Sequence, residues 1–210
     1  LDVCDEVSLH EILCDNDIVF HYAANASVPI SYEKPIYDFS VNCGSTLSIL
    51  NYLRKSNQDI CLVLASTSAV YGVQDDLPVS ETAKVKPISN YGASKLAAET
   101  YCRLFTRLYG LKTTILRYFN VYGPLQPRYV MNDFCDKMSS SSNVLEVLGT
   151  GKQERDFIYI DDAIKSSFLV LEKGKVGVPV NVGTGKATSI KELAELTVDF
   201  YNVQKEIKYL

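Results

Sequence analysis

The sequence feature that most constrains the fold is a short apolar run, Ile60–Ala65, which ends in the polar triplet Ser66-Thr67-Ser68. An unbroken apolar run of this length is typical of a strand that is buried on both faces of a parallel sheet. Parallel strands are joined by crossover connections, most of them helical, so such a strand predicts helices on both sides of the sheet. The chain is therefore expected to adopt an α/β fold.

Strands and helices alternate along the rest of the chain, as expected for a doubly wound parallel sheet. Strands are predicted at residues 17–22, 60–65, 113–118, 144–148, 157–160, 180–182 and 207–210. Helices are predicted at 38–54, 91–109, 129–138 and 188–201, with one more after residue 160. We expect Asp161 or Asp162 to cap the helix after 160, and Thr188 or Ser189 to cap the last helix.

The composition of the 210 residues excludes several kinds of partner. A net charge of −4 gives no basic surface for nucleic acid, and no apolar run approaches the roughly 20 residues that span a membrane. Six scattered cysteines without a Cys-x-x-Cys pair are typical of reduced, packed thiols in the cytoplasm. The two histidines, His10 and His21, share no ligand spacing with cysteines or carboxylates, so no metal site is predicted.

Chemistry is first indicated by Tyr91 and Lys95, which stand four residues apart at the head of a predicted helix. This spacing puts a phenol and an ammonium on one helical face, where the positive charge lowers the pKa of tyrosine from roughly 10 and favours a phenolate base. On an ordinary helix such a pair is more often two surface neighbours. Here, residues 66–68 end a parallel strand, and strand ends and helix starts of such a sheet meet in one crevice. The sequence therefore predicts a hydroxyl, a phenol and an ammonium side by side.

Eight segments together resemble a known family. They are Leu1–Asp5, Val19–Ala24, Val41-Asn42, Ser66–Gly72, Tyr91–Lys95, Arg117–Pro124, Arg155–Asp162 and Asn181–Gly185. In this order they are similar to the extended short-chain dehydrogenase/reductases, and among these to the NAD-dependent nucleotide-sugar epimerases and dehydratases, typified by UDP-glucose 4-epimerase. The resemblance runs through nearly the whole chain and implies a Rossmann-type sheet with a smaller α/β substrate domain.

The resemblance also implies which parts of the chain bind the cofactor and which bind the substrate. Residues 1–122 and 158–183 are expected to form part of an NAD-binding Rossmann domain, and residues 123–157 and 184–210 part of the substrate domain. Family members open with a strand and a Gly-rich turn that binds the cofactor pyrophosphate. The sequence has no such turn, so we expect an internal fragment that lacks roughly 50 to 60 residues of the Rossmann unit and binds cofactor poorly. The residue that selects NAD over NADP would lie in that part, which leaves this choice open.

Residue roles follow from the resemblance, position by position. Tyr91 would be the base, Lys95 would lower its pKa and hold the cofactor ribose, and Thr67 would hydrogen-bond the reacting oxygen. The positions that match cofactor contacts are Asp2, Val3, Ala23, Ala24, Asn42, Tyr91, Lys95 and Tyr118. Those that match substrate contacts are Ser68, Asn120 and Arg155, whose guanidinium suits a diphosphate. Oxidation of a sugar carbinol needs a hydride acceptor that no side chain supplies, which requires a nicotinamide cofactor.

The residues after Thr67 distinguish among the activities of the family. Dehydratases carry an acidic pair at the positions of Ser68 and Ala69, and UDP-glucuronate decarboxylases usually carry Glu at the position of Ala69. The expected activity is therefore 4-epimerisation of a UDP-sugar through a transient 4-keto intermediate, with NAD regenerated. Two alternatives stay open: a dehydratase or reductase of the same family, and a non-catalytic member that binds nucleotide. Ser45 stands where relatives often have Gly, and Leu125 where they often have Arg.

The helix predicted at 91–109 has more apolar surface than one sheet can cover. Its polar stripe is limited to Glu99, Arg103 and Thr106, whereas a helix that lies on one sheet needs only about a third of its surface to be apolar. The excess predicts a second partner for this helix. One candidate is the smaller domain of the same chain; the resemblance implies instead a homodimer built from helices 38–54 and 91–109.

Overall fold

The computed structural model describes residues 2–13, 17–56 and 59–210. The chain divides into two compact units, which are described separately. Unit 1 comprises Leu1–Tyr118 and Lys165–Val182, and unit 2 comprises Phe119–Ile164 and Gly183–Leu210. This division follows backbone contacts and assigns no ligand. The predicted division by ligand, into 1–122 with 158–183 and 123–157 with 184–210, therefore stays a prediction.

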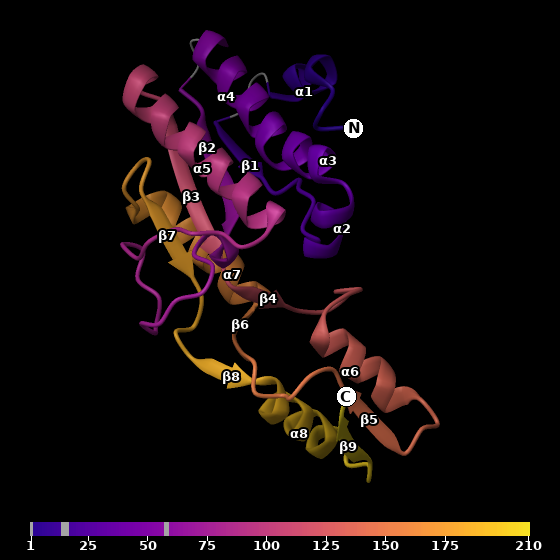
Figure 1. Ribbon diagram of the computed structural model, residues 1–210. Helices are drawn as coiled ribbons and strands as arrows, with labels where there is room; N and C mark the ends of the chain where they lie inside the picture. Colours follow the sequence, from indigo (N-terminus) through magenta and orange to yellow (C-terminus); the bar gives the residue numbers. More distant parts are fainter. Residues whose placement is uncertain (1, 14–16, 57–58) are drawn as a thin grey trace. The chain divides into compact units, whose positions relative to one another are not determined.

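Unit 1 contains a four-stranded sheet in the order β1-β2-β3-β7, in which every neighbouring pair is parallel (Figure 1). Thr67 pairs with Tyr118, and Tyr118 pairs with Val182, so β2, β3 and β7 end at one edge of the sheet. The parallel α/β sheet that the apolar run predicts is confirmed. The strands are β1 Ile18–His21, β2 Cys61–Thr67, β3 Lys112–Tyr118 and β7 Pro179–Val182.

Helices lie on both faces of this sheet. On one face, α1 (Glu6–Leu13), α4 (Ser45–Ser56) and α5 (Asn90–Tyr109) enclose the main core. The largest apolar side chains of that core are Leu9, Leu13, Ile49, Leu50, Leu53, Ile60, Leu62, Leu64, Phe105 and Ile115. On the other face, Phe168 of α7 (Ile160–Lys173) contacts Phe20, with 5.5 Å between ring centroids. Because strand side chains alternate, Val19 packs on the main core and Phe20 faces away from it.

The helix predicted at 38–54 is a continuous helical run that changes type. It begins as α3 (Pro35–Phe39), passes through a π-helical turn at Ser40–Gly44, and continues as α4. Two hydroxyls next to the turn, those of Ser45 and Thr46, donate hydrogen bonds to backbone carbonyls inside it. The short helix before this run, α2 (Val28–Glu33), was not predicted.

Helix α5 agrees with the predicted range 91–109 to within one residue, and a capping residue stands at each end. At the start, Ser89 accepts a hydrogen bond from the Gly92 N–H at 3.0 Å, as a capping serine does. At the end, Gly110 takes a left-handed conformation with φ 71° and donates its N–H to the Thr106 carbonyl.

The start of α7 shows that one predicted cap was wrong. The helix begins at Ile160, directly after a strand, so Asp161 and Asp162 lie inside its first turn. Carboxylates in the first turn still interact favourably with the partial positive charge of the helix N-terminus. In α8 (Ile190–Tyr201), the cap is Ser189, one of the two predicted residues, and it accepts the Glu192 N–H at 3.0 Å.

Unit 2 contains two small sheets. In the first, β4 (Asn120–Tyr122) runs parallel to β6 (Glu154–Tyr159), and β8 (Ala187–Ser189) runs antiparallel to β6. In the second, β5 (Val144–Val147) runs parallel to β9 (Glu206–Tyr209). The second sheet packs with α6 (Val130–Ser139) and α8 around a core formed by Phe134, Met138, Leu145, Val147, Leu193 and Ala194.

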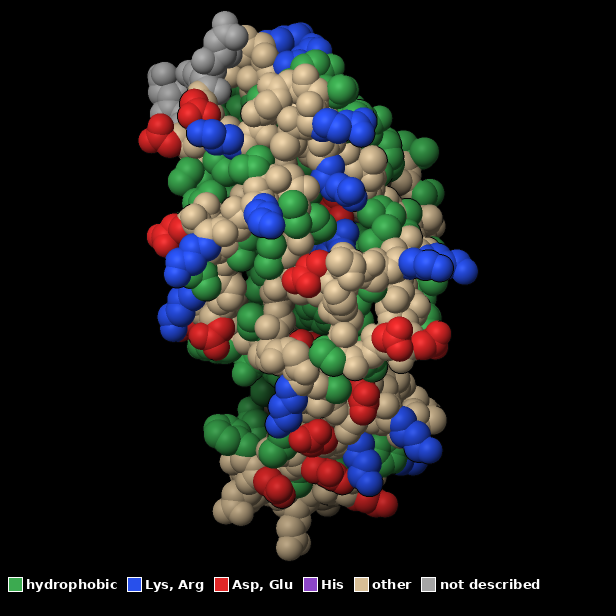
Figure 2. Space-filling model, turned by 90° about the vertical axis from the view of Figure 1, so that its left-hand side faces the viewer, with side chains coloured by type: hydrophobic (Ala, Val, Ile, Leu, Met, Phe, Trp, Pro, Cys, Tyr) green, Lys and Arg blue, Asp and Glu red, His purple; other side chains and the backbone are tan. Residues whose placement is uncertain are grey.

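The surface and the cysteines bear on the predicted partners and compartment. On the face shown in Figure 2, Lys and Arg side chains are interspersed with Asp and Glu. None of the helices that the structure describes combines the length and the apolar composition needed to cross a membrane. Of the cysteines predicted to be packed, Cys43 and Cys102 are buried, whereas Cys4 and Cys135 are exposed; Cys14 lies outside the described residues.

Candidate active site

The predicted hydroxyl, phenol and ammonium belong to two adjoining elements of unit 1. Thr67 is the last residue of β2 and is 9% exposed, and its hydroxyl accepts the Ala69 N–H at 3.2 Å. Tyr91 is half-buried in the first turn of α5. Lys95, one turn later, is 2% exposed and donates a hydrogen bond to the Ala65 carbonyl at 2.9 Å. The head of α5 and the end of β2 are therefore in direct contact.

A close backbone approach fixes the same contact. Gly92 lies so near the Ala69 carbonyl that an added Cβ would stand 2.7 Å from its oxygen. Only glycine tolerates this distance without a shift of the backbone. Ser68 lies in the 3-10 turn Ser68–Val70 that follows β2, so it stands beside Thr67 at this junction.

Lys95 is perturbed by its burial. Burial disfavours the ammonium and lowers the pKa of Lys95 to about 8, while the Asp38 carboxylate acts in the opposite direction. Its partner in the structure is a backbone carbonyl of β2. The predicted contact with a cofactor ribose stays a prediction.

A buried carboxylate that the sequence did not indicate lies beneath the head of α5. Asp38 is 1% exposed and accepts hydrogen bonds from the Asn25 amide at 2.7 Å, the Asn42 amide at 3.0 Å and the Ser94 hydroxyl at 2.7 Å. Asn42, predicted as a cofactor contact, is fully buried, and its side-chain oxygen accepts the Asn25 N–H at 2.9 Å. Its predicted contact with the cofactor stays a prediction.

Other predicted cofactor positions lie at the carboxyl ends of strands. Tyr118 ends β3, and its hydroxyl lies 2.6 Å from the hydroxyls of both Tyr22 and Ser167. Burial raises the pKa of Tyr118, so the phenol stays neutral. Ala23 and Ala24 follow β1. Near the start of the chain, Asp2 accepts the Cys4 N–H at 2.9 Å, and its neighbour Val3 is half-buried.

His21 is a packed histidine that contacts Ser45. Its ring nitrogen Nε2 lies 3.1 Å from the hydroxyl of Ser45, the residue that stands where relatives often have glycine. Burial, with a smaller effect of the Lys95 charge, lowers the pKa of His21 to about 4. Within the described part of the chain, no three His, Cys, Asp or Glu side chains are grouped as ligands for a metal ion.

Unit 2 holds the two remaining predicted substrate residues. Asn120 opens β4 and donates to the Asp156 carbonyl at 2.9 Å. Arg155 precedes Asp156 on β6. Its side chain is exposed and donates a hydrogen bond to the carbonyl of the adjacent Glu154 at 2.7 Å. The Asp156 carboxylate in turn accepts the N–H groups of Thr184 and Gly185 at 2.9 Å and 2.8 Å. The sequence did not indicate that Asp156 joins β6 to the turn after β7.

One prediction about α5 was wrong. Glu99 was assigned to a polar stripe with Arg103 and Thr106, but its side chain is fully buried against the sheet. The reason is an ion pair with Arg117 on β3, 2.6 Å between the closest atoms. Thr106 also faces the sheet, with its hydroxyl 2.7 Å from that of Thr113, and only Arg103 is exposed.

Comparison with known proteins agrees with this architecture. A Methanocaldococcus jannaschii protein provisionally named UDP-glucose 4-epimerase is 40% identical over 187 residues, which are 87% of this chain and 60% of that protein. Thermotoga maritima UDP-glucose 4-epimerase, solved with UDP-glucose, has a TM-score of 0.91 at 33% identity and covers 100% of this chain and 70% of that chain. Bacillus cereus UDP-glucuronic acid 4-epimerase, solved with UDP-glucuronic acid and NAD, has a TM-score of 0.90 at 31% identity. The match covers 100% of this chain and 67% of that chain.

These matches cover most or all of this chain but only 60–70% of each related protein. The chain spans 60% of the length of the Methanocaldococcus jannaschii relative. The family pattern itself covers residues 1–183. This chain belongs to the NAD dependent epimerase/dehydratase family.

Proposed function

We propose that the protein is a nucleotide-sugar 4-epimerase that acts on a UDP-sugar through a transient 4-keto intermediate with bound NAD. The observation that supports this proposal is the contact between the end of β2, which carries Thr67, and the head of α5, which carries Tyr91 and the buried Lys95. Neither Ser68 nor Ala69 next to this junction can act as an acid, which disfavours a dehydratase.

The residues at the strand ends fit a nicotinamide cofactor in their chemistry. The edge where β2 and β3 end offers hydroxyl groups from Thr67 and Tyr118, and the small residues Ala23 and Ala24 after β1 allow a close backbone approach. Hydroxyls and backbone groups are suitable partners for ribose and carboxamide. The cofactor would accept the hydride of a sugar carbinol and return it, which no side chain can do.

The protein's own groups handle the proton. Tyr91 takes the proton of the sugar 4-hydroxyl and gives it back after the hydride has returned to the other face of the ring. The positive charge of Lys95 one helical turn away favours the phenolate form of Tyr91. Thr67 donates a hydrogen bond to the reacting oxygen and so holds it near the phenol. Cofactor is regenerated in each turnover, and no second substrate is consumed.

In unit 2, Arg155 is the proposed partner of the nucleotide diphosphate. Its guanidinium is exposed, and its one described hydrogen bond is to a neighbouring carbonyl, so donor groups are available for a bidentate phosphate contact. Asn120 and Ser68 are the proposed polar contacts to the sugar. The related enzymes solved with UDP-glucose and UDP-glucuronic acid favour uridine as the base.

We also propose a cytoplasmic homodimer. Apolar surface remains on α5, where Leu108 is 56% exposed and Tyr109 is 45% exposed. A second copy that packs its own α4 and α5 helices on this surface would bury these side chains. Reduced thiols such as the buried, free Cys43 and Cys102 are in keeping with the cytoplasm.

The experiment is to incubate purified full-length protein with UDP-glucose or UDP-N-acetylglucosamine and follow the sugar configuration by NMR. Absorbance of reduced nicotinamide is recorded in parallel. Epimerisation at C4 without net cofactor reduction is the expected result. A stable 4-keto-6-deoxy product would assign a dehydratase. Stoichiometric cofactor reduction would assign a dehydrogenase, and stoichiometric oxidation of added reduced cofactor a reductase. Turnover of a dTDP- or GDP-sugar alone would keep the chemistry and overturn the substrate.

A further inference from the structure

A fully buried ion pair joins α5 to the sheet of unit 1. The side chains of Glu99 and Arg117 are 0% and 2% exposed. Arg117 Nε lies 3.0 Å and 3.2 Å from the two carboxylate oxygens, and Nη2 lies 2.6 Å from one of them. Buried ion pairs often give no more stability than apolar side chains of the same size. The presence of this pair is therefore better explained by what it holds in place.

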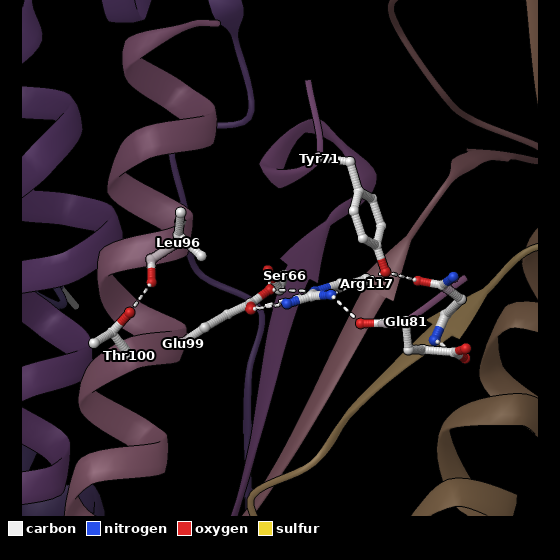
Figure 3. Close-up of polar contacts among 8 residues, drawn as sticks. Ser66, Tyr71, Glu81, Leu96, Glu99, Thr100 and Arg117 are labelled. Carbon is white, nitrogen blue, oxygen red and sulfur yellow. Dashed lines mark hydrogen bonds and ion pairs between the residues drawn. The ribbon is translucent and has the colours of Figure 1, made fainter. Parts of the chain in front are cut away.

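The ion pair is the centre of a wider network, which Figure 3 shows. The Ser66 hydroxyl of β2 donates to the Glu99 carboxylate. Arg117 Nη1 donates to the Tyr71 hydroxyl at 2.9 Å, and the guanidinium lies over the Tyr71 ring, 4.8 Å from its centroid. The Tyr71 hydroxyl donates onward to Asn181 of β7 at 2.7 Å. The network thus connects α5 to β2, β3 and β7 near the carboxyl ends of these three strands.

The same helical face contacts the strand end at three places. Gly92, Lys95 and Glu99 are spaced by three and four residues, so they lie on one face of α5. Gly92 packs on the Ala69 carbonyl and Lys95 bonds to the Ala65 carbonyl. Glu99 holds Ser66, the residue directly before Thr67. Contacts on both sides of Thr67 therefore set its place relative to the helix that carries Tyr91.

We propose that Glu99, held by Arg117, is a positioning residue that fixes the Thr67 end of β2 against the Tyr91 helix through the Ser66 hydroxyl. The effect of this positioning on catalysis rests on the proposed function. Glu99 does not touch the reacting atoms, and it acts through the strand. If its role were only structural, any α5-to-sheet hydrogen bond would serve as well as this one.

The chain offers a matched pair of variants for this distinction. Ser66→Ala removes the hydroxyl that joins the ion pair to the catalytic strand end. Thr106→Val removes a hydroxyl from another α5-to-sheet contact, the 2.7 Å pair with Thr113, at the far end of the same helix. Glu99→Gln is less suitable, because it leaves the buried Arg117 guanidinium without a charged partner. A loss of activity in that variant could then come from a loss of stability. Ser66→Thr keeps the hydroxyl and serves as the conservative variant.

In full-length protein, Ser66→Ala should lower kcat by roughly 10- to 100-fold with little change in KM, because small displacements of reacting groups slow the chemical step. The isotope effect with a UDP-sugar deuterated at C4 should grow in this variant, since hydride transfer becomes more rate-limiting. Thr106→Val should leave kcat and the isotope effect unchanged, and Ser66→Thr should retain most of the activity. An unchanged kcat in Ser66→Ala would overturn the proposal.

A second readout does not depend on the reaction. Amide hydrogen exchange in residues 65–71 should become faster in Ser66→Ala and stay unchanged in Thr106→Val. Equal exchange in the two variants would overturn the positioning role. If the wild-type protein turns over no nucleotide-sugar, the proposed function fails, and the exchange comparison still decides whether this ion pair fixes the strand end.

Discussion

The candidate residues of the two units are held in opposite ways. In unit 1, Thr67 and Lys95 are buried; Thr67 pairs with Tyr118 of β3, and Lys95 donates to the Ala65 carbonyl of β2. In unit 2, Arg155 is exposed and hydrogen-bonds only to an adjacent carbonyl among its described contacts. Groups that transfer protons and hydride need fixed positions, whereas a group that binds a charged ligand can adjust. Substitutions in unit 1 are therefore expected to change kcat, and those in unit 2 to change KM.

The strongest test of this contrast is Tyr91→Phe. It removes the ionisable hydroxyl and keeps the ring, so kcat should fall by on the order of 10² or more while the fold is retained. On full-length protein, steady-state kinetics measures kcat and circular dichroism shows whether the fold is retained. Tyr101→Phe, on the same helix and also half-buried, is the control that should keep its activity. Near-normal turnover by well-folded Tyr91→Phe would contradict the role of the phenol.

The counterpart in unit 2 is Arg155→Ala. Loss of charge-assisted contacts worth about 1.5–3 kcal/mol should raise KM for the UDP-sugar by roughly 10- to 100-fold, with kcat and cofactor affinity little changed. Lys191→Ala is the matched control, because it removes another charge of unit 2 that is 60% exposed. An effect on kcat alone would break the proposed contrast between the units.

A stability measurement compares buried and exposed carboxylates directly. Asp38→Ala leaves the Asn25, Asn42 and Ser94 donors without their buried acceptor, and the free energy of unfolding should fall by about 1–3 kcal/mol. In unit 2, Asp133→Ala breaks an ion pair with Lys137 in which the side chains are 51% and 28% exposed. The expected loss there is below about 1 kcal/mol. Urea denaturation of both variants gives the comparison, and equal losses would contradict it.

The last test is a dependence on pH that involves Lys95. Its pKa is about 8 in the folded protein, below the ordinary 10.5, because burial disfavours the ammonium. Between these values the unfolded chain binds more protons, so this group makes the free energy of unfolding rise with pH. Over the same range kcat should fall, because the Tyr91 phenolate loses the nearby positive charge. Lys95→Met should lose the rise in stability, and an identical stability profile in the two proteins would contradict the assigned burial effect.

The parts of the fold that could be predicted have local signals. The Ile60–Ala65 run predicted a buried parallel strand, and residues 91–109 were recognisable as a helix. Strands β4 and β8 have three residues each, too few to show an alternating pattern. The position of Glu99 was missed for another reason. Its partner, Arg117, lies on β3, and helical periodicity says nothing about charges on a different element.

The candidate site was predictable to a similar extent. Tyr91 and Lys95 could be linked by chemistry, since four-residue spacing on a helix brings their side chains to one face. Arg155 and Asn120 were assigned only by resemblance. Asp38 was missed because an aspartate at the start of a predicted helix resembles an ordinary first-turn acid. Its burial depends on Asn25 and Ser94, which are distant in sequence.

The π-helical turn at Ser40–Gly44 sets the rotation between the two ends of this helical run, and the α-helices beside it limit how the sequence can vary in length. Each residue of an α-helix turns the chain by about 100°, so one residue gained or lost rotates all that follows relative to all that precedes it. Asp38 lies before the turn and Ile49 and Leu50 lie after it, and all three are buried. Deletion of a single residue from the α-helical part between the turn and Ile49 would therefore rotate one of these groups toward water, whereas the π-helical turn has one residue more than an α-helical turn and could absorb the loss. We expect natural variation in that α-helical part to exchange residue types and to preserve their number.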